Sequence, residues 1–172
     1  MKQETSVIPQ ADVLWDVARV AEAVARGHET TEAIGGYIGA KGPRQGLYYT
    51  QAARILGLVD ESPDDRRVAL TTYGRSFIAY DQSSQRQAMR RLLRQREPTR
   101  SVLDTLRAQG DLDLDGVAQV LQRIAPLANS TANRRARTTI AWLISAGLAT
   151  WRAGCLHYIP VATLTGGFLR SH

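Results

Sequence analysis

The stretch NSTANRRARTTIAWLISAGLA, residues 129–149, carries the strongest pattern in the chain. It begins with residue types that cap helices, continues with a basic, hydrogen-bonding turn, and ends at Gly147. Apolar residues at helical spacing follow the basic turn: Ile140, Leu143, Ile144 and Ala146. The pattern predicts a helix with a basic front and an apolar rear. This is typical of a helix that reads DNA, although a solvated arginine face would give the same pattern.

The charge of the chain is unevenly divided around this stretch. Residues 1–82 hold nine Lys or Arg and eleven Asp or Glu, a net charge of −2. Residues 83–172 hold thirteen Arg and five acidic residues, a net charge of +8. A basic half beside a nearly neutral half indicates a polyanionic partner that the second half attracts.

Composition places the chain among ordinary globular proteins. Its 172 residues, 44% hydrophobic and 22% charged, are enough for one domain or two small ones. The sequence has no apolar run long enough to cross a membrane, and its first residues do not resemble a secretory signal. The single Cys155 has no internal disulfide partner, so we expect a cytoplasmic protein.

Apolar periodicity and Gly or Pro breaks divide the chain into short elements. In the first half we expect helices at 10–26, 32–38 and 45–56, then strands at 58–59 and 67–70. The second half shows helices at 85–96, 99–109, 117–124 and 129–147, then a hairpin at 148–159. We therefore expect two domains, at residues 10–82 and 98–160, joined by a connector helix at 83–97. Tails are expected at 1–9 and 161–172. The predicted class is mainly α with short β-hairpins (α+β).

The two halves repeat one order of elements, which is three helices followed by a hairpin. Aligning Gly57 with Gly147, an offset of 90, superimposes the two glycine-terminated helices and the hairpins behind them. Identity between the halves is low, so the repeat is one of pattern. The same unusual order in two independent segments strengthens the fold prediction.

Two features of the first half carry a resemblance to a known fold family. The stretch GLYYTQAARILGLVD and the exit Leu70-Thr71-x-x-Gly74 resemble tandem winged helix-turn-helix domains of restriction-type endonucleases, and more loosely MarR-like regulators. The resemblance covers about residues 10–160 and implies two winged helix-turn-helix domains in tandem that bind double-stranded DNA. The acidic residues of the first half depart from a strongly basic reader and leave open whether both domains touch DNA.

The resemblance to winged-helix domains implies a set of candidate DNA-binding residues. At the front of the first recognition helix lie Arg44, Gln45, Tyr48 and Gln51, and at the front of the second lie Asn133, Arg134, Arg135, Arg137 and Thr138. The hairpin tips add Arg66, Arg67, Arg152 and His157, and the connector helix adds Arg86, Arg90, Arg91 and Arg94. Arginine donates to phosphates or to a guanine edge, and asparagine pairs with adenine. We expect Tyr48 to point outward, Tyr49 to be buried, and Trp142 and Trp151 to pack in the core.

No pattern in the sequence indicates catalysis. The histidines His28, His157 and His172 are scattered, and there is no CxxC pair or phosphate-binding loop. We therefore expect no enzyme activity, no metal and no cofactor. The alternative to DNA binding is an adaptor whose acidic first domain binds a partner protein.

Overall fold

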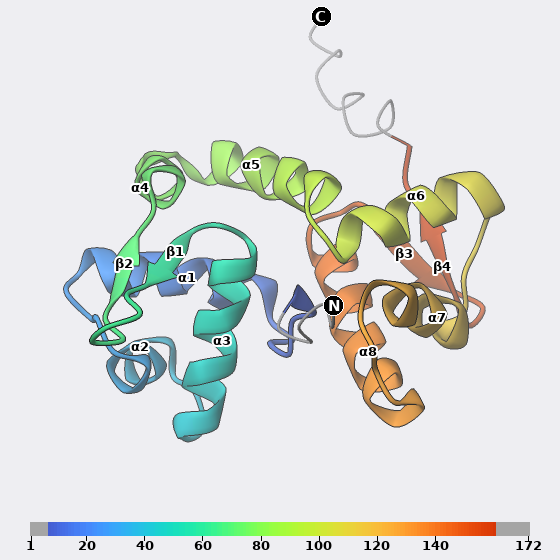
Figure 1. Ribbon diagram of the computed structural model, residues 1–172. Helices are drawn as coiled ribbons and strands as arrows, with labels where there is room; N and C mark the ends of the chain where they lie inside the picture. Colours follow the sequence, from blue (N-terminus) through green and yellow to red (C-terminus); the bar gives the residue numbers. More distant parts are fainter. Residues whose placement is uncertain (1–6, 161–172) are drawn as a thin grey trace, which may run out of the picture.

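The computed structural model describes residues 7–160 of the chain, so most of the two expected tails lies outside the described residues. The first half contains α1 (Leu14–Ala25), α2 (Thr31–Ile38), α3 (Pro43–Ile55), β1 (Val59–Glu61) and β2 (Val68–Leu70). Two further helices, α4 (Thr72–Ala79) and α5 (Gln82–Gln95), follow. The second half contains α6 (Thr99–Gln109), α7 (Leu114–Ile124), α8 (Asn129–Ser145), β3 (Ala149–Arg152) and β4 (Cys155–Tyr158). The described chain is mainly helical with two antiparallel hairpins, as expected (Figure 1).

The predicted repeat is present in the backbone hydrogen bonds. At the end of α3, Leu58 N donates to Ala53 O at 3.0 Å; at the end of α8, Leu148 N donates to Leu143 O at 2.9 Å. These pairs are offset by 90 residues, as are Gly57 and Gly147, whose φ angles are +74° and +72°. Glycine adopts this left-handed conformation without steric cost, which explains why each helix ends there.

In each half, a short extended segment forms backbone hydrogen bonds with the second strand of the hairpin. Val68 N in β2 donates to Glu29 O, between α1 and α2, at 2.8 Å. In the second half, Leu112 lies between α6 and α7 and forms an antiparallel bridge with Leu156 in β4. Each half is therefore a helix, a short extended segment, two helices and a hairpin, with the extended segment bonded to the hairpin.

The Leu-Thr-x-x-Gly exit closes the first hairpin through the hydroxyl of Thr71 and the close approach of Gly74. Thr71 Oγ1 donates to Gly57 O at 2.6 Å and accepts from Gly74 N at 2.9 Å, so one hydroxyl joins the end of α3 to the start of α4. A Cβ on Gly74 would lie 1.9 Å from Leu58 O. Only glycine fits there, which gives the motif its physical reason.

Several helix boundaries differ from the predicted ones because of capping side chains. Helix α5 begins at Gln82, three residues earlier than expected, since Asp81 accepts from Ser84 N at 2.7 Å. Likewise α7 begins at Leu114, because Asp113 accepts from Gly116 N at 2.7 Å. Helix α3 begins at Pro43, which is suited to a first turn.

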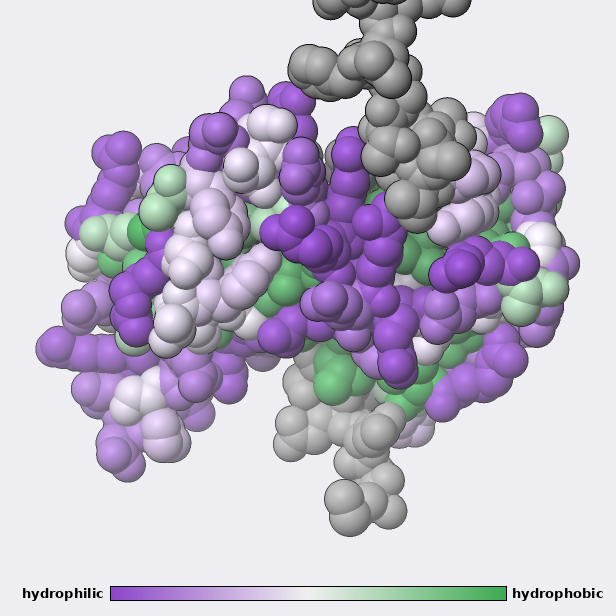
Figure 2. Space-filling view, turned by 90° about the horizontal axis from the view of Figure 1, so that it is seen from above, coloured by the Kyte–Doolittle hydropathy of each residue, from purple (hydrophilic) through white to green (hydrophobic). Residues whose placement is uncertain are grey.

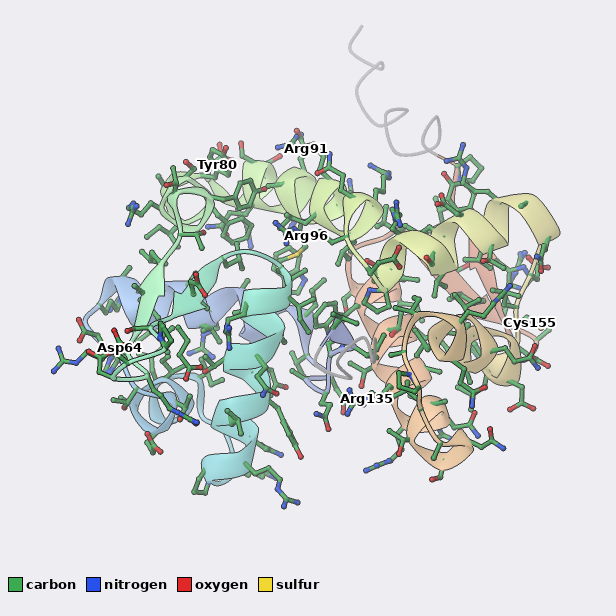
Figure 3. The ribbon with its side chains drawn as sticks, in the orientation of Figure 1. Asp64, Tyr80, Arg91, Arg96, Arg135 and Cys155 are labelled. Atoms are coloured by element: carbon green, nitrogen blue, oxygen red, sulfur yellow. The ribbon has the colours of Figure 1, made fainter. Side chains whose placement is uncertain are left out.

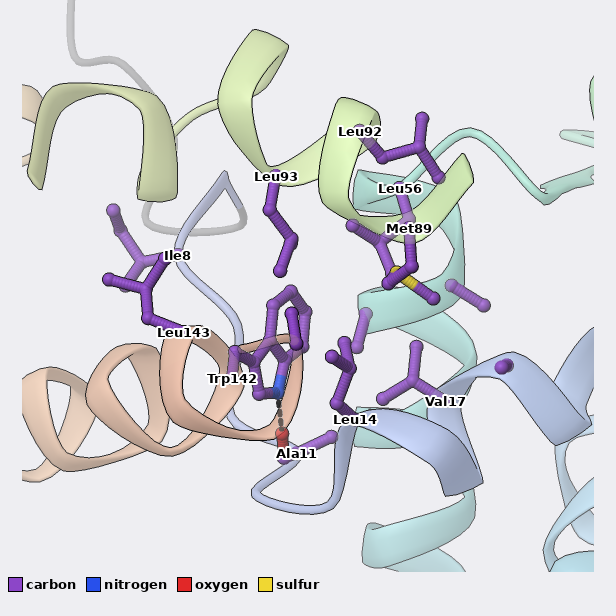
Figure 4. Close-up of a cluster of buried hydrophobic side chains, with 14 of the residues drawn as sticks. Ile8, Ala11, Leu14, Val17, Leu56, Met89, Leu92, Leu93, Trp142 and Leu143 are labelled. Atoms are coloured by element: carbon purple, nitrogen blue, oxygen red, sulfur yellow. Dashed lines mark hydrogen bonds between the residues drawn. The ribbon is translucent and has the colours of Figure 1, made fainter. Parts of the chain in front are cut away.

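The first helix starts later than predicted, at Leu14, and the preceding residues have another role. Residues 8–13, here called the N-terminal segment, run without helical structure, and Ile8 and Ala11 are buried. The tail that we expected to end at Pro9 therefore contributes to the core. Trp142 of α8 donates through Nε1 to Ala11 O at 2.7 Å (Figure 4).

One hydrophobic core runs through both halves. Leu14 and Leu56 from the first half, Met89 and Leu93 from α5, and Trp142 from α8 belong to the same cluster (Figure 4). The predicted boundary near residue 98 thus separates two repeats that share a core. Their relative placement is fixed by packing as well as by the connection between them.

Candidate nucleic-acid interface

The amino-terminal ends of α3 and α8 lie at the same edge of the molecule. In Figure 1 both helices descend to the lower edge, and the two hairpins lie on the outer left and right. The two helices are equivalent in the repeat and were the predicted recognition helices. The fold therefore brings the two predicted front turns to one side, where a single extended ligand can reach both.

The front of α8 offers two exposed arginines. Arg134 and Arg137 are exposed, and Asn133 is half-buried beside a shallow depression that Asp115 and Gln119 also line. No acidic residue precedes them in the first turn of α8. These three predicted residues have the exposure and donor chemistry that contact with phosphates or base edges requires.

The predicted outward placement of two other residues on this front is wrong, because their side chains face the N-terminal segment. Thr138 is only 4% exposed, and its hydroxyl donates to Asp12 Oδ1. Arg135 is half-buried and donates through Nη1 to Ile8 O at 2.8 Å. Figure 3 shows Arg135 between the two halves of the molecule. Both side chains hold the N-terminal segment against α8.

The surroundings of Arg135 agree with a structural role. Partial burial lowers the pKa of its guanidinium, and the nearby charge of Arg134 acts in the same direction. Tyr48 of α3 acts in the opposite direction. Because one residue interacts with α3, α8 and the N-terminal segment, substitutions of Arg135 are poor tests of DNA binding.

The front of α3 is polar but carries less positive charge. Arg44 and Gln45 are exposed, and Gln45 Oε1 accepts from Lys41 N at 2.8 Å. Gln51 and Tyr48 are half-buried. Tyr49 is also half-buried, so the predicted contrast between the two tyrosines is wrong; burial raises the pKa of the Tyr49 phenol, whose oxygen accepts from Val13 N.

The two hairpin tips differ in their free positive charge. Arg66 is exposed in a left-handed conformation, with φ at +57°. Its neighbour Arg67 forms ion pairs with Glu29 at 3.3 Å and Asp65 at 3.7 Å. In the second hairpin Arg152 is exposed, and His157 Nδ1 lies 2.8 Å from Asp111. The first tip therefore combines the exposed Arg66 with acidic residues that pair with Arg67, whereas the second presents the exposed Arg152.

The connector arginines divide into two groups, which sequence reasoning did not distinguish. Arg86 and Arg91 are exposed on α5, which lies at the opposite edge from the front turns of α3 and α8 (Figure 1), so they are not beside the other candidate residues. Arg90 instead reaches the carboxyl end of α8 and donates to Ala146 O at 2.8 Å. Arg96, which we did not predict as functional, donates to Ile55 O at 3.1 Å. The spacing of four along the helix gives no signal for either contact.

Apolar side chains lie exposed behind the basic front of α8. Trp142 is fully buried as predicted, but Trp151 is 42% exposed, so its predicted core placement is wrong. Ile144, on the predicted apolar face of α8, is 41% exposed. Together with Leu114, Ile140 and Ala141, Trp151 and Ile144 line a groove of about 400 Å³, which Arg137 also borders. We call this the α8 groove.

Comparisons with known proteins give a family without an assigned role. A family model described as a domain of unknown function (DUF7226) matches residues 18–145, and the chain belongs to this family. Neither a curated protein nor a solved structure matches the chain. Within residues 7–160 no helix is long and apolar enough to cross a membrane, and no cluster of three or more His, Cys, Asp or Glu side chains is placed to hold a metal ion.

Proposed function

We propose that this member of the DUF7226 family binds double-stranded DNA through two winged helix-turn-helix modules in tandem. The single observation that carries the proposal is the placement of the front turns of α3 and α8 at one edge of the molecule (Figure 1). The repeated order of helices and hairpin, with its bridging segment, supports the assignment of each half to the winged-helix class. The proposal assigns a binding role and no catalytic one.

In this proposal α8 provides the stronger contact. Arg134 and Arg137 donate to phosphates or to a guanine edge, and Asn133 reads a neighbouring base. Arg152 on the second hairpin contacts the adjacent backbone. On the first module Arg44 and Gln45 make the equivalent contacts, which are weakened by the acidic residues around the first hairpin tip. The asymmetry in charge makes the second module the main source of affinity.

A second candidate is an adaptor that binds a protein through the α8 groove. Exposed Ile144 and Trp151 in one groove favour this reading, since exposed aromatic and aliphatic side chains are common in protein interfaces. The groove shares α8 with the basic front, so the two functions are separable by substitution on one helix.

Replacing Arg134 and Arg137 by alanine is expected to weaken binding of a mixed-sequence duplex by roughly 100-fold, about tenfold for each lost arginine contact. Fluorescence anisotropy at low salt measures the affinity. Both side chains are exposed, so the melting temperature should change little.

Two matched variants control this experiment. Arg86→Ala with Arg91→Ala removes the same charge from exposed positions on α5 and should change affinity less than threefold, because α5 lies at the opposite edge (Figure 3). Ile144→Ser with Trp151→Ser alters the α8 groove alone. An equal loss in all three variants would contradict a localised interface. If the groove variant alone lost DNA binding, the contact surface would be the groove and not the basic front.

A further inference from the structure

Helix α5 and Arg96, the residue that follows it, contact the carboxyl ends of both proposed recognition helices through arginines. Arg96 Nη1 donates to Ile55 O at the end of α3, at 3.1 Å, and Arg90 Nε donates to Ala146 O at the end of α8, at 2.8 Å. A cation at a helix carboxyl end satisfies free carbonyl groups and interacts favourably with the helix dipole. Two equivalent ends are thus bound by one helix and the residue that follows it.

The glycines at these ends permit the close approach of the guanidinium groups. A Cβ added to Gly57 would lie 2.5 Å from Arg96 Nη2, and one added to Gly147 would lie 3.2 Å from Arg90 Nη2. The same turn that ends each helix therefore leaves space for the arginine. The contact recurs in both repeats, although Arg90 lies in α5 and Arg96 is the residue that directly follows this helix.

The rest of α5 has one buried side and one hydrophilic side. Its lower side buries Met89 and Leu93 in the core that contains Leu56 and Trp142 (Figure 4). Hydrophilic side chains cover the middle of the upper face, where α5 lies (Figure 2). Packing therefore holds α5 against both halves, and the two arginines reach the ends of α3 and α8 from it.

The N-terminal segment adds a second connection between the same helices. Val13 N donates to Tyr49 Oη on α3 at 3.3 Å, and Ala11 O accepts from Trp142 on α8. These two contacts lie behind the front turns, whereas the same segment meets the front of α8 at Arg135 and Thr138 and leaves Arg134 and Arg137 exposed. Helices α3 and α8 are therefore both contacted by α5 at their carboxyl ends and by the N-terminal segment, which lies between them.

We propose that Arg90 and Arg96 are positioning residues, and that α5 holds α3 and α8 at one spacing so that they read a single bipartite DNA site. This rests on the proposed function. Two half-sites read by a rigid pair of helices must lie on one face of the duplex at a fixed separation. Modules on a flexible linker would accept a range of separations.

The first test measures the spacing without DNA. Spin labels are attached at Leu47→Cys on α3 and Ser130→Cys on α8, both at exposed positions, with Cys155→Ser as the background. Pulsed electron paramagnetic resonance should give one narrow distribution of label-to-label distances for the protein without further substitutions. Arg90→Ala with Arg96→Ala should broaden it, and Arg86→Ala with Arg91→Ala should leave it unchanged.

A lysine pair keeps this test decisive if the alanine pair does not fold. Arg90→Lys with Arg96→Lys retains a cation at each helix end but loses the planar guanidinium, and should give an intermediate width. A distribution that is broad in the starting protein, or equally narrow in every folded variant, would overturn the role of these arginines.

The second test measures the consequence for DNA. The probe is the duplex recovered by selection from a random library, compared with the same duplex carrying about five extra central base pairs, which is half a helical turn. The insertion should cost the unchanged protein about tenfold or more in affinity, and the Arg90→Ala with Arg96→Ala variant less than about threefold.

The outcomes separate this proposal from the proposed function. If the insertion is tolerated while Arg134→Ala with Arg137→Ala still abolishes binding, DNA binding stands and the bipartite site is wrong. If no duplex binds, the proposed function and the bipartite site both fail. The distance measurement then still decides whether α5 positions the two helices.

Discussion

Replacing Gly74 by alanine is expected to lower the free energy of unfolding by about 3 kcal/mol or more. A Cβ at this position would lie 1.9 Å from Leu58 O, a backbone atom that has no flexible side chain to yield. To relieve this clash, α4 must move away from the hairpin, which breaks the hydrogen bonds of Thr71 with Gly57 O and Gly74 N. Urea unfolding followed by circular dichroism measures the change.

Gly36 provides the matched control for this substitution. It lies in α2, and a Cβ there would meet no atom within 4 Å. Gly36→Ala should therefore stabilise the protein by up to about 1 kcal/mol, since alanine has the higher helix propensity. If both variants had the same stability, the close approach at Gly74 would not be the reason for the Leu-Thr-x-x-Gly motif.

Replacing Trp142 by alanine is expected to cost about 3–5 kcal/mol, the range for removing a buried aromatic side chain. Trp142 is fully buried between the two repeats and donates to Ala11 O, so the variant leaves both a cavity and a carbonyl without this donor. Because the cavity lies in a shared core, amide hydrogen exchange should accelerate in α1 and α3 as well as in α8.

Trp151 offers a control of the same residue type. It is 42% exposed on β3, and Trp151→Ala should cost less than about 1 kcal/mol. Loss of protection confined to α6, α7 and α8 in the Trp142→Ala protein would contradict the continuous core and indicate two independent domains.

The sequence predicted most of the local structure, because local chemistry determines it. Gly57 and Gly147 end their helices as expected, and Thr30 caps α2 by accepting from Ala33 N at 3.2 Å. Thr99–Gln109 was predicted with the bounds that α6 has. In each case a single residue type has a strong conformational preference, and the apolar period around it agrees.

Contacts between distant segments were not predictable in the same way. The burial of Ile8 depends on α8, which lies more than a hundred residues away, and an extended segment has no helical period to reveal it. Arg90 and Arg94 look alike in sequence, and their spacing of four does not reveal that Arg90 donates to the end of α8. Trp151 was assigned to the core because large aromatic side chains usually pack, whereas its strand lies at the surface.

In the candidate site, too, local features were predicted from the sequence and contacts with distant segments were not. Arg134 and Arg137 were predicted from the basic turn and are exposed. Thr138 and Arg135 share that turn, but the helix directs them towards the N-terminal segment, whose position the sequence did not reveal. Successive residues of a helix are rotated by about 100°, so an exposed side chain can be followed directly by a buried one. A basic turn therefore predicts that a helix is present more reliably than it predicts which of its side chains are exposed.

The salt dependence of duplex binding tests the central claim most directly. Each phosphate contact releases condensed counterions and contributes about 0.9 to the slope of log affinity against log salt concentration. Contacts from Arg44, Arg134, Arg137 and Arg152 predict a slope of roughly −3 to −4 for a mixed-sequence duplex. Absence of binding at low salt, or a slope near zero, would contradict DNA binding and leave the protein-binding groove as the better account.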